Sequence, residues 1–238
     1  MAQFTWIAAE QSDASEFVQH YGDTVNVSLV SYDGQDAVEM FTTTASTGIV
    51  RLGSVAQATD FDLVYRSRGP DSLSNAFSHG GAVRIGSDGL GYGAAIWGSL
   101  RLMKHTPGSS SLESTSATTT ERRSWWWTRI TITGSSLLAR FWEGALEDEN
   151  DTREMTATDS SYTSPAFAGV RTINGIARFT HFYVGTDGDP APTEPLGGAE
   201  PFLLRHNPRT NKVIPVLSSP TVTDIGATCV RPRVTKGF

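Results

Sequence analysis

The chain has 238 residues, of which 38% are hydrophobic, 10% aromatic and 18% charged. This balance excludes a largely disordered protein, because disorder requires low hydrophobicity together with high net charge. The net charge of −6 argues against nucleic acid as a partner, since an acidic surface repels phosphates. A single cysteine, Cys229, excludes an internal disulfide, and no apolar run is long enough to span a membrane.

Residues 1–22 are predicted to form an N-terminal segment with one short helix. Residues 4–7 have an extended pattern, and residues 12–20 are compatible with a helix that has Ser12 as its N-cap and Phe17 on its inner face. The start of the chain lacks the basic and apolar regions of a signal peptide. We therefore expect a protein that is made in the cytoplasm and that, if it works outside the cell, leaves it by some route other than a leader of its own.

From residue 23 onward the sequence changes to short alternating segments that are typical of β-strands. Phe61, Leu63 and Tyr65 show the clearest alternation, and Gly69-Pro70 ends their segment. Between residues 23 and 105 we expect strands at 25–30, 38–41, 48–52, 61–68, 82–85, 92–97 and 100–105, and the last two of these should form a hairpin. Residues 107–120 are rich in serine and threonine and are predicted to be either a long loop or an edge strand.

A second hairpin, with strands at 125–133 and 137–142, is the most distinctive element of the sequence. The alternation places Trp126 on the same face as Ile130, and places Trp125 and Trp127 on the opposite face. One of these two faces of the hairpin must pack against the hydrophobic core. We expect at least two of the three tryptophans to be core or half-buried residues, and one could instead stack on a sugar ring.

The remainder of the chain is predicted to consist of two more strands, a linker and a tail. Residues 143–164 are polar, and their acidic run 147–151 is expected to lie in a solvated loop. Residues 167–171 and 176–184 are the last strands of the body. The expected divisions are a body at 23–189, a linker rich in proline and glycine at 190–199, and a C-terminal arm at 200–238.

These elements predict an all-β protein. About a dozen short strands with almost no helix favour an antiparallel sandwich of two sheets, because every sheet must bury one of its faces. A barrel is the alternative, and periodicity alone does not separate the two.

The second hairpin also resembles a known family. Residues 125–134 and 137–144 resemble the central hairpin of concanavalin A-like (LamG-like) jelly rolls, several of which belong to phage virion proteins. The likeness continues at 80–102, 169–171 and 177–185. It implies a jelly-roll body for which glycan contact would be a natural task. The candidate ligand contacts are Trp125, Trp127, Trp97 and Tyr92.

The C-terminal arm is basic although the rest of the chain is acidic. Residues 200–238 contain six basic and two acidic residues, whereas the remainder contains 13 basic and 23 acidic ones. The arm resembles segments of minor virion proteins of tailed phages, and such a proline-broken strand set could add to the sheet edge of a neighbour. A solvated tail without contacts is the alternative. The candidate assembly residues are Arg205, Arg209, Lys212, Arg231, Arg233, Lys236 and Phe238.

The sequence offers no set of residues that would make it an enzyme. A glycosidase needs two carboxylates roughly 5–10 Å apart, whereas Glu39 and Glu113 are isolated and the run 147–151 lies in a predicted loop. The histidines are scattered, and no hydrolase motif occurs. No cofactor is predicted. Calcium could bind the oxygen atoms of 147–151 or of 187–189, where we favour a plain linker turn.

These features together predict a structural virion protein of a tailed bacteriophage, at the tail tip, the baseplate or another minor position. Its partners would be other virion proteins, copies of itself and a host-surface polysaccharide. The exposed candidate loops lie near 87–91, 107–120 and 145–163. The alternatives are a carbohydrate-binding module without a virion role and a glycosidase of the same fold, which an assay of polysaccharide hydrolysis would distinguish.

Overall fold

A computed structural model describes residues 3–69, 78–97, 99–105, 110–116, 123–150, 153–192, 203–207 and 212–216. The chain divides into two compact units, Met1–Leu196 and Gly197–Phe238. We call the first unit the body. The second unit contains a hairpin of β14 (Leu203–Asn207) and β15 (Lys212–Val216).

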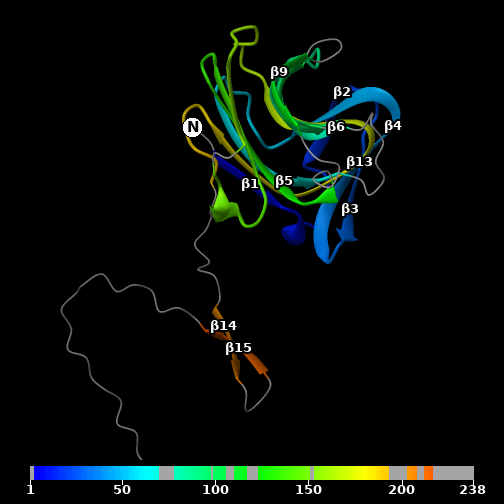
Figure 1. Ribbon diagram of the computed structural model, residues 1–238. Helices are drawn as coiled ribbons and strands as arrows, with labels where there is room; N and C mark the ends of the chain where they lie inside the picture. Colours follow the sequence, from blue (N-terminus) through cyan, green and yellow to red (C-terminus); the bar gives the residue numbers. More distant parts are fainter. Residues whose placement is uncertain are drawn as a thin grey trace, which may run out of the picture. The chain divides into compact units, whose positions relative to one another are not determined.

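The body is a sandwich of two antiparallel layers (Figure 1). Sheet 1 consists of β3 (Asn26–Tyr32), the first half of β4 (Gln35–Leu52), β1 (Gln3–Ile7), the second half of β13 (Phe167–Thr186), β5 (Phe61–Arg68), β10 (Trp126–Thr133), β11 (Ser136–Trp142) and β12 (Glu154–Thr158). Sheet 2 consists of β2 (Phe17–Gly22), the second half of β4, the first half of β13, β6 (Ser78–Ile85), β7 (Gly91–Trp97), β8 (Ser99–His105) and β9 (Ser110–Ser116). The prediction of an all-β, two-sheet jelly-roll sandwich is confirmed.

Helical structure is confined to short turns. The described residues contain no α-helix, and Ala8–Glu10 and Leu146–Asp148 are single 3-10 turns. Accordingly, no helix in the described part of the chain is long and apolar enough to cross a membrane.

Strands β4 and β13 run through both layers and connect their hydrogen bonds into one network. The pairing between them shifts register where β13 passes from Ile173 to Gly175, while the partner on β4 changes from Thr47 to Thr42. Such an irregularity bends a strand without ending it. We predicted two separate strands in each of these segments, and that prediction is wrong. The two predicted pieces are the halves that lie in different sheets.

Gly48 lies beside this bend, where β4 enters sheet 2. A Cβ atom at this position would lie 2.5 Å from Val25 Cγ2 and 2.8 Å from Thr42 Cγ2. Real Cβ atoms do not approach other atoms so closely, so the close packing at the bend requires glycine.

The space between the sheets is filled by one continuous apolar cluster. Trp126, Ile130 and Ile132 of β10 are at most 2% exposed and face this cluster together with Tyr65 and Phe182. The alternation predicted for the second hairpin is therefore confirmed. Burying side chains of this size stabilises the fold by roughly 1.5–3 kcal/mol each.

The predicted helix at residues 12–20 is wrong, because residues 17–22 form strand β2. Phe17 faces inward as expected, but it pairs with Leu52 of β4 and packs edge-to-face on Trp6, with ring centroids 4.9 Å apart. Pairing with β4 satisfies the backbone groups of this segment. Tertiary packing of this kind overrides the weak helical preference of a short segment.

Two polar segments also contain edge strands. Residues 110–116 form β9, so the edge strand is the correct alternative for this part of the Ser/Thr-rich stretch. An exposed loop was predicted near residues 145–163, but this segment contains β12, which pairs with β11 from Ser136 opposite Thr158 to Arg140 opposite Glu154. Only Met155 of this strand is fully buried, which left too little alternation to reveal it.

Candidate ligand-binding face

The face of sheet 1 that points away from the core carries side chains from neighbouring strands in register. We call it the outer face. Alternate residues of paired strands project on the same side of a sheet. From β5 across β10 and β11 to β12, the pairing produces four rows: Arg66, Trp127, Trp142; then Val64, Arg129, Arg140, Glu154; then Asp62, Thr131, Leu138, Thr156; then Thr133, Ser136, Thr158.

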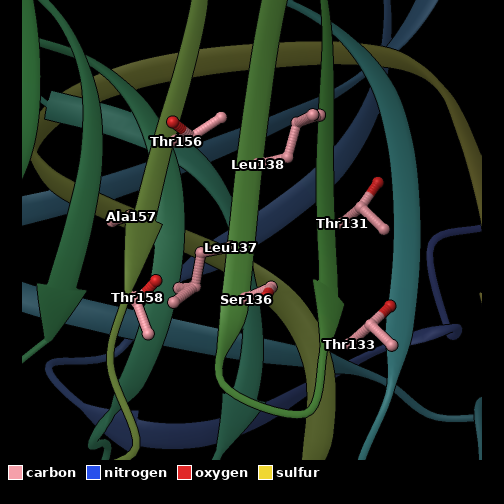
Figure 2. Close-up of a pocket in the computed structure, with 8 residues that line it drawn as sticks. All are labelled: Thr131, Thr133, Ser136, Leu137, Leu138, Thr156, Ala157 and Thr158. Carbon is pink, nitrogen blue, oxygen red and sulfur yellow. The ribbon is translucent and has the colours of Figure 1, made fainter.

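A groove of about 570 Å³ opens over the last two rows, on β10, β11 and β12 (Figure 2). This volume lies in the range of small-molecule sites. Five of its eight lining residues bear hydroxyl groups, and Leu138 adds an apolar patch between them. The lining residues are Thr131, Thr133, Ser136, Leu137, Leu138, Thr156, Ala157 and Thr158.

A smaller hollow of about 210 Å³ shares Thr131 and Thr133 with the groove and extends it toward β5. Two carboxylates, Asp60 and Asp62, lie in its wall. The Asp60 carboxylate already accepts the backbone N–H of Gly134 at 3.0 Å. It also forms an ion pair with Arg84 at 3.1 Å. The hollow therefore continues the groove without adding a free charge at Asp60.

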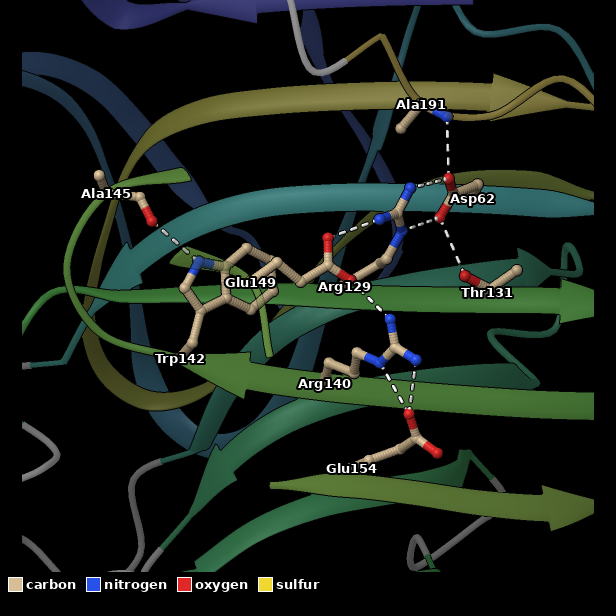
Figure 3. A network of polar contacts seen from close by, with 9 residues as sticks. All are labelled: Asp62, Arg129, Thr131, Arg140, Trp142, Ala145, Glu149, Glu154 and Ala191. Carbon is tan, nitrogen blue, oxygen red and sulfur yellow. Dashed lines mark hydrogen bonds and ion pairs between the residues drawn. The ribbon is translucent and has the colours of Figure 1, made fainter. Parts of the chain in front are cut away.

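Asp62 is the most heavily bonded residue of the outer face (Figure 3). Its two oxygens accept Nε and Nη2 of Arg129 at 2.8 and 2.7 Å, the Thr131 hydroxyl at 2.9 Å and the backbone N–H of Ala191 at 2.9 Å. Burial raises the pKa of Asp62, but the hydrogen bonds and the charge of Arg129 outweigh burial and bring the pKa below its ordinary value. The carboxylate is therefore ionised and fixed in place.

The same arrangement continues across β10 and β11 through Glu149. One oxygen of Glu149 accepts Nη1 of Arg129 at 2.6 Å, and the other accepts Nη1 of Arg140 at 3.1 Å (Figure 3). Arg140 in turn donates from Nε to Glu154 at 2.7 Å. Hydrogen bonds between ionised groups are stronger than those between neutral groups, so these contacts hold both partners in place. These residues and Asp62 form a network of ion pairs that connects four strands, β5, β10, β11 and β12, with the 143–149 segment beside the groove.

The aromatic row beyond this network is covered. Trp127 lies between Trp142 and Tyr183, with centroids 6.3 Å away in both cases and nearly parallel rings. The Trp142 indole N–H donates to the Ala145 carbonyl at 3.0 Å, and Leu146 packs against the row. The segment after β11 therefore folds back over these rings and leaves the hydroxyl-lined groove as the open part of the face.

The four candidate ligand contacts lie in different places. Trp125 and Trp127 belong to the outer face, where Trp125 is half-buried and Trp127 is 5% exposed. Tyr92 is fully buried in sheet 2, and its hydroxyl donates to Asp159 at 2.6 Å, so it faces the core and not a ligand. The side chain of Trp97, at the end of β7, lies outside the described residues.

The candidate assembly residues are described only in part. Arg205 lies in β14 and Lys212 in β15, so each belongs to a strand of the hairpin in the second unit. The remaining candidates, Arg209, Arg231, Arg233, Lys236 and Phe238, lie outside the described residues.

The sequence did not identify the groove or the network. The predicted exposed loop 145–163 does contain three groove residues, Thr156, Ala157 and Thr158, but they lie in a strand. Glu149 was expected to be solvated, and this expectation is wrong because Arg129 and Arg140 both bind it. The signal that could have found the groove is the row of hydroxyl residues, which appears only once the register of β10, β11 and β12 is known.

The candidate calcium ligands serve as turn and cap residues. Among the described residues, no three histidine, cysteine, aspartate or glutamate side chains gather as a metal site would require. The backbone N–H of Asp187 donates to the Asp60 carbonyl at 3.1 Å, and the Asp148 carboxylate accepts the backbone N–H of Ala145 at 2.8 Å.

The chain matches no protein-family model and no curated protein. Among solved structures, the carbohydrate-binding module CBM66 from Bacillus subtilis aligns with a TM-score of 0.54 at 12% identity, over 72% of this chain and 96% of that one. The CBM2 module of the evolved Dit protein of Lactobacillus casei BL23 phage J-1 aligns at 0.47 and 13% identity, over 78% and 96%. The lumenal domain of VIP36 aligns at 0.49 and 10% identity, over 78% and 90%. The likeness to CBM66 shows a shared fold.

Proposed function

We propose that the body of this chain binds glycans in the groove over β10, β11 and β12. The observation that carries this proposal is the groove itself, which combines five hydroxyl-bearing side chains with the apolar Leu138 in about 570 Å³. Hydroxyl groups both donate and accept hydrogen bonds, as the hydroxyl groups of a sugar do. The neighbour with the same fold, CBM66, is a carbohydrate-binding module, which supports the same reading.

Binding without hydrolysis is the activity that the charges favour. A glycosidase needs one carboxyl group that stays protonated near neutral pH. Beside the groove, Asp62 is paired with Arg129, and Glu154 is paired with Arg140. Although burial raises the pKa of Asp62, Arg129 more than offsets it, so this carboxyl is a poor proton donor.

We further propose that this body is part of the virion of a tailed bacteriophage and contacts a host-surface polysaccharide. The support is the resemblance of residues 125–134, 137–144, 169–171 and 177–185 to LamG-like domains, several of which belong to virion proteins, together with the basic arm at 200–238. Other virion proteins and copies of the chain would then be its partners. The second candidate is a glycan-binding module outside any virion, which the likeness to CBM66 favours. Mass spectrometry of purified particles distinguishes the two, since only the first predicts this chain among the particle proteins.

The groove is tested with the full chain on an array of bacterial surface polysaccharides, followed by calorimetry with the glycan that binds best. Thr133 and Thr158 are exposed threonines in the groove, and Thr24 is an exposed threonine outside it. The double variant Thr133→Val/Thr158→Val should weaken binding about tenfold, because it removes two hydrogen-bonding groups. Thr24→Val should leave the affinity unchanged. Full affinity in the double variant, or no binding to any glycan, would refute the proposal.

A further inference from the structure

The two rows of side chains in the groove differ in what they offer a ligand (Figure 2). Thr133, Ser136 and Thr158 form one row across β10, β11 and β12, and all three are exposed. Their hydroxyl groups make no hydrogen bond within the described part of the chain. Each of them is therefore open to donate a hydrogen bond to a sugar and to accept one from it. We call these three residues the hydroxyl row.

The other row has Leu138 at its centre, between Thr131 on β10 and Thr156 on β12. The Thr131 hydroxyl donates to Asp62 at 2.9 Å, so its hydrogen atom is already in use. In Figure 2 the Thr156 methyl group lies on the side of Leu138, and the Thr156 hydroxyl oxygen lies on the far side. Neither neighbour therefore directs a hydroxyl hydrogen toward the space over Leu138.

Leu138 is an apolar side chain on the polar side of the sheet. It is half-buried and belongs to none of the apolar clusters of the described residues, whereas the adjacent Leu137 is 2% exposed and faces the core. Single exposed leucines are common on protein surfaces, but this one lines a groove of about 570 Å³. Burial of Leu138 is favourable when an apolar part of a ligand covers it.

The lining of the groove offers no charge for selecting a ligand. The eight lining residues that the structure describes include neither a charged nor an aromatic side chain. The carboxylates nearby are compensated, since Asp62 is paired with Arg129 and Glu154 with Arg140. Selection among glycans in this groove therefore depends on hydrogen bonds to the hydroxyl row and on apolar contact with Leu138.

We propose that the groove selects a neutral sugar that carries a methyl group, and that this methyl group packs on Leu138. The inference rests on the proposed glycan-binding function, because it names the class of glycan. Leu138 and Ser136 are two residues apart on β11, which places the two rows about 7 Å apart. A pyranose ring carries the substituent of C5 and the hydroxyl groups of C2 and C3 on opposite edges, so one sugar reaches both rows.

A sugar with a hydroxyl group in place of the methyl group fits the same space less well. Its hydroxyl group would exchange water for an apolar side chain, and burying a polar group without a hydrogen bond is unfavourable. A methyl group gains from the same contact, because its apolar surface leaves water. The methyl group can come from a 6-deoxyhexose, at C6, or from the acetamido group of an N-acetylhexosamine.

The test compares matched pairs of sugars on the full chain by NMR titration, which measures the weak binding of single sugars. L-Fucose with L-galactose and L-rhamnose with L-mannose differ only by the hydroxyl group at C6, and N-acetylglucosamine with glucose differs at C2. We expect the methyl-bearing member of at least one pair to bind about tenfold more tightly. The pair that shows this preference identifies the source of the methyl group. Equal affinities within every pair would overturn the inference.

Two variants link the preference to Leu138. Leu138→Ala removes the apolar contact and should reduce the preference to less than about twofold, while circular dichroism checks that the variant is folded. Val18→Ala is the control, because it shortens a 38% exposed apolar side chain on β2, outside the groove. A preference that persists in folded Leu138→Ala would also contradict the inference. The groove would still be supported in that case if Thr133→Val/Thr158→Val weakened both members of a pair equally.

Discussion

Arg129 binds Asp62 through two parallel hydrogen bonds, from Nε to Oδ1 at 2.8 Å and from Nη2 to Oδ2 at 2.7 Å. The pair joins β10 to β5, and the side chains are only 20% and 9% exposed. Asp62 also accepts the Thr131 hydroxyl and the Ala191 N–H. One carboxylate thereby ties a groove residue to the segment that follows β13.

Replacing Asp62 with asparagine should destabilise the body substantially. Arg129 would keep Glu149 but lose its bidentate partner, and removing one member of a largely buried pair costs about 3 kcal/mol. Urea denaturation measures the free energy of unfolding. Asp33→Asn is the matched control, because Asp33 is 57% exposed in its pair with Arg68. That change should cost less than about 1 kcal/mol, and equal losses in the two variants would contradict the prediction.

The stability of the body should decrease in acid before its carboxylates titrate. Burial lowers the pKa of His79 from 6.5 to about 3. Between these values the unfolded chain takes up a proton that the folded chain excludes, so the free energy of unfolding falls as pH is lowered. The slope from one such histidine reaches about 1.4 kcal/mol per pH unit. Denaturation at several pH values from 7 to 4 should show a shallower slope in His79→Phe, and an unchanged slope would refute the assignment.

Gly48→Ala should destabilise the bend in β4. Its Cβ would lie 2.5 Å from Val25 Cγ2 and 2.9 Å from the Asp23 carbonyl oxygen, and overpacking of this kind costs about 1–3 kcal/mol. Gly53→Ala is the comparison, because the nearest atom to its Cβ would be Val18 Cγ2 at 3.2 Å. Thermal unfolding should rank Gly48→Ala well below Gly53→Ala, and the reverse order would show that the bend tolerates a side chain.

Deleting residues 200–238 should leave a folded body that no longer joins its assembly. All buried apolar residues of the described core clusters lie at or before Ala191, and Met1–Leu196 is a compact unit by itself, so we expect the body to fold without the arm. Circular dichroism checks the fold, and complementation of a deletion phage followed by analysis of the particles checks incorporation. Normal incorporation of the truncated chain would exclude a docking role for the arm.

The sequence correctly predicted on which face of a strand a side chain lies, because this depends only on alternation within that strand. Trp126 and Trp127 were assigned to opposite faces, and the structure buries the first between the sheets and the second under the 143–149 segment. Its predictions of secondary structure were less accurate where a segment becomes a strand by pairing with residues that are distant in the sequence. Residues 17–22 became a strand because β4 offers them a partner at Leu52.

The candidate site depends even more on distant residues. Glu149 seemed solvated because its partners, Arg129 and Arg140, come from two other segments of the chain. Thr133, Ser136 and Thr158 form one row only through the β11–β12 register. No local pattern specifies that register, since β12 is short and has a single fully buried residue.

The central claim, that glycan binds on the outer face of sheet 1, is tested most directly by following backbone amide resonances of the full chain during titration with the glycan that binds best. We expect the largest shifts at residues 131–138 and 154–158 of β10, β11 and β12, with little change in β6, β7 and β8. Shifts concentrated in sheet 2 or in the turn at residues 86–90 would contradict it.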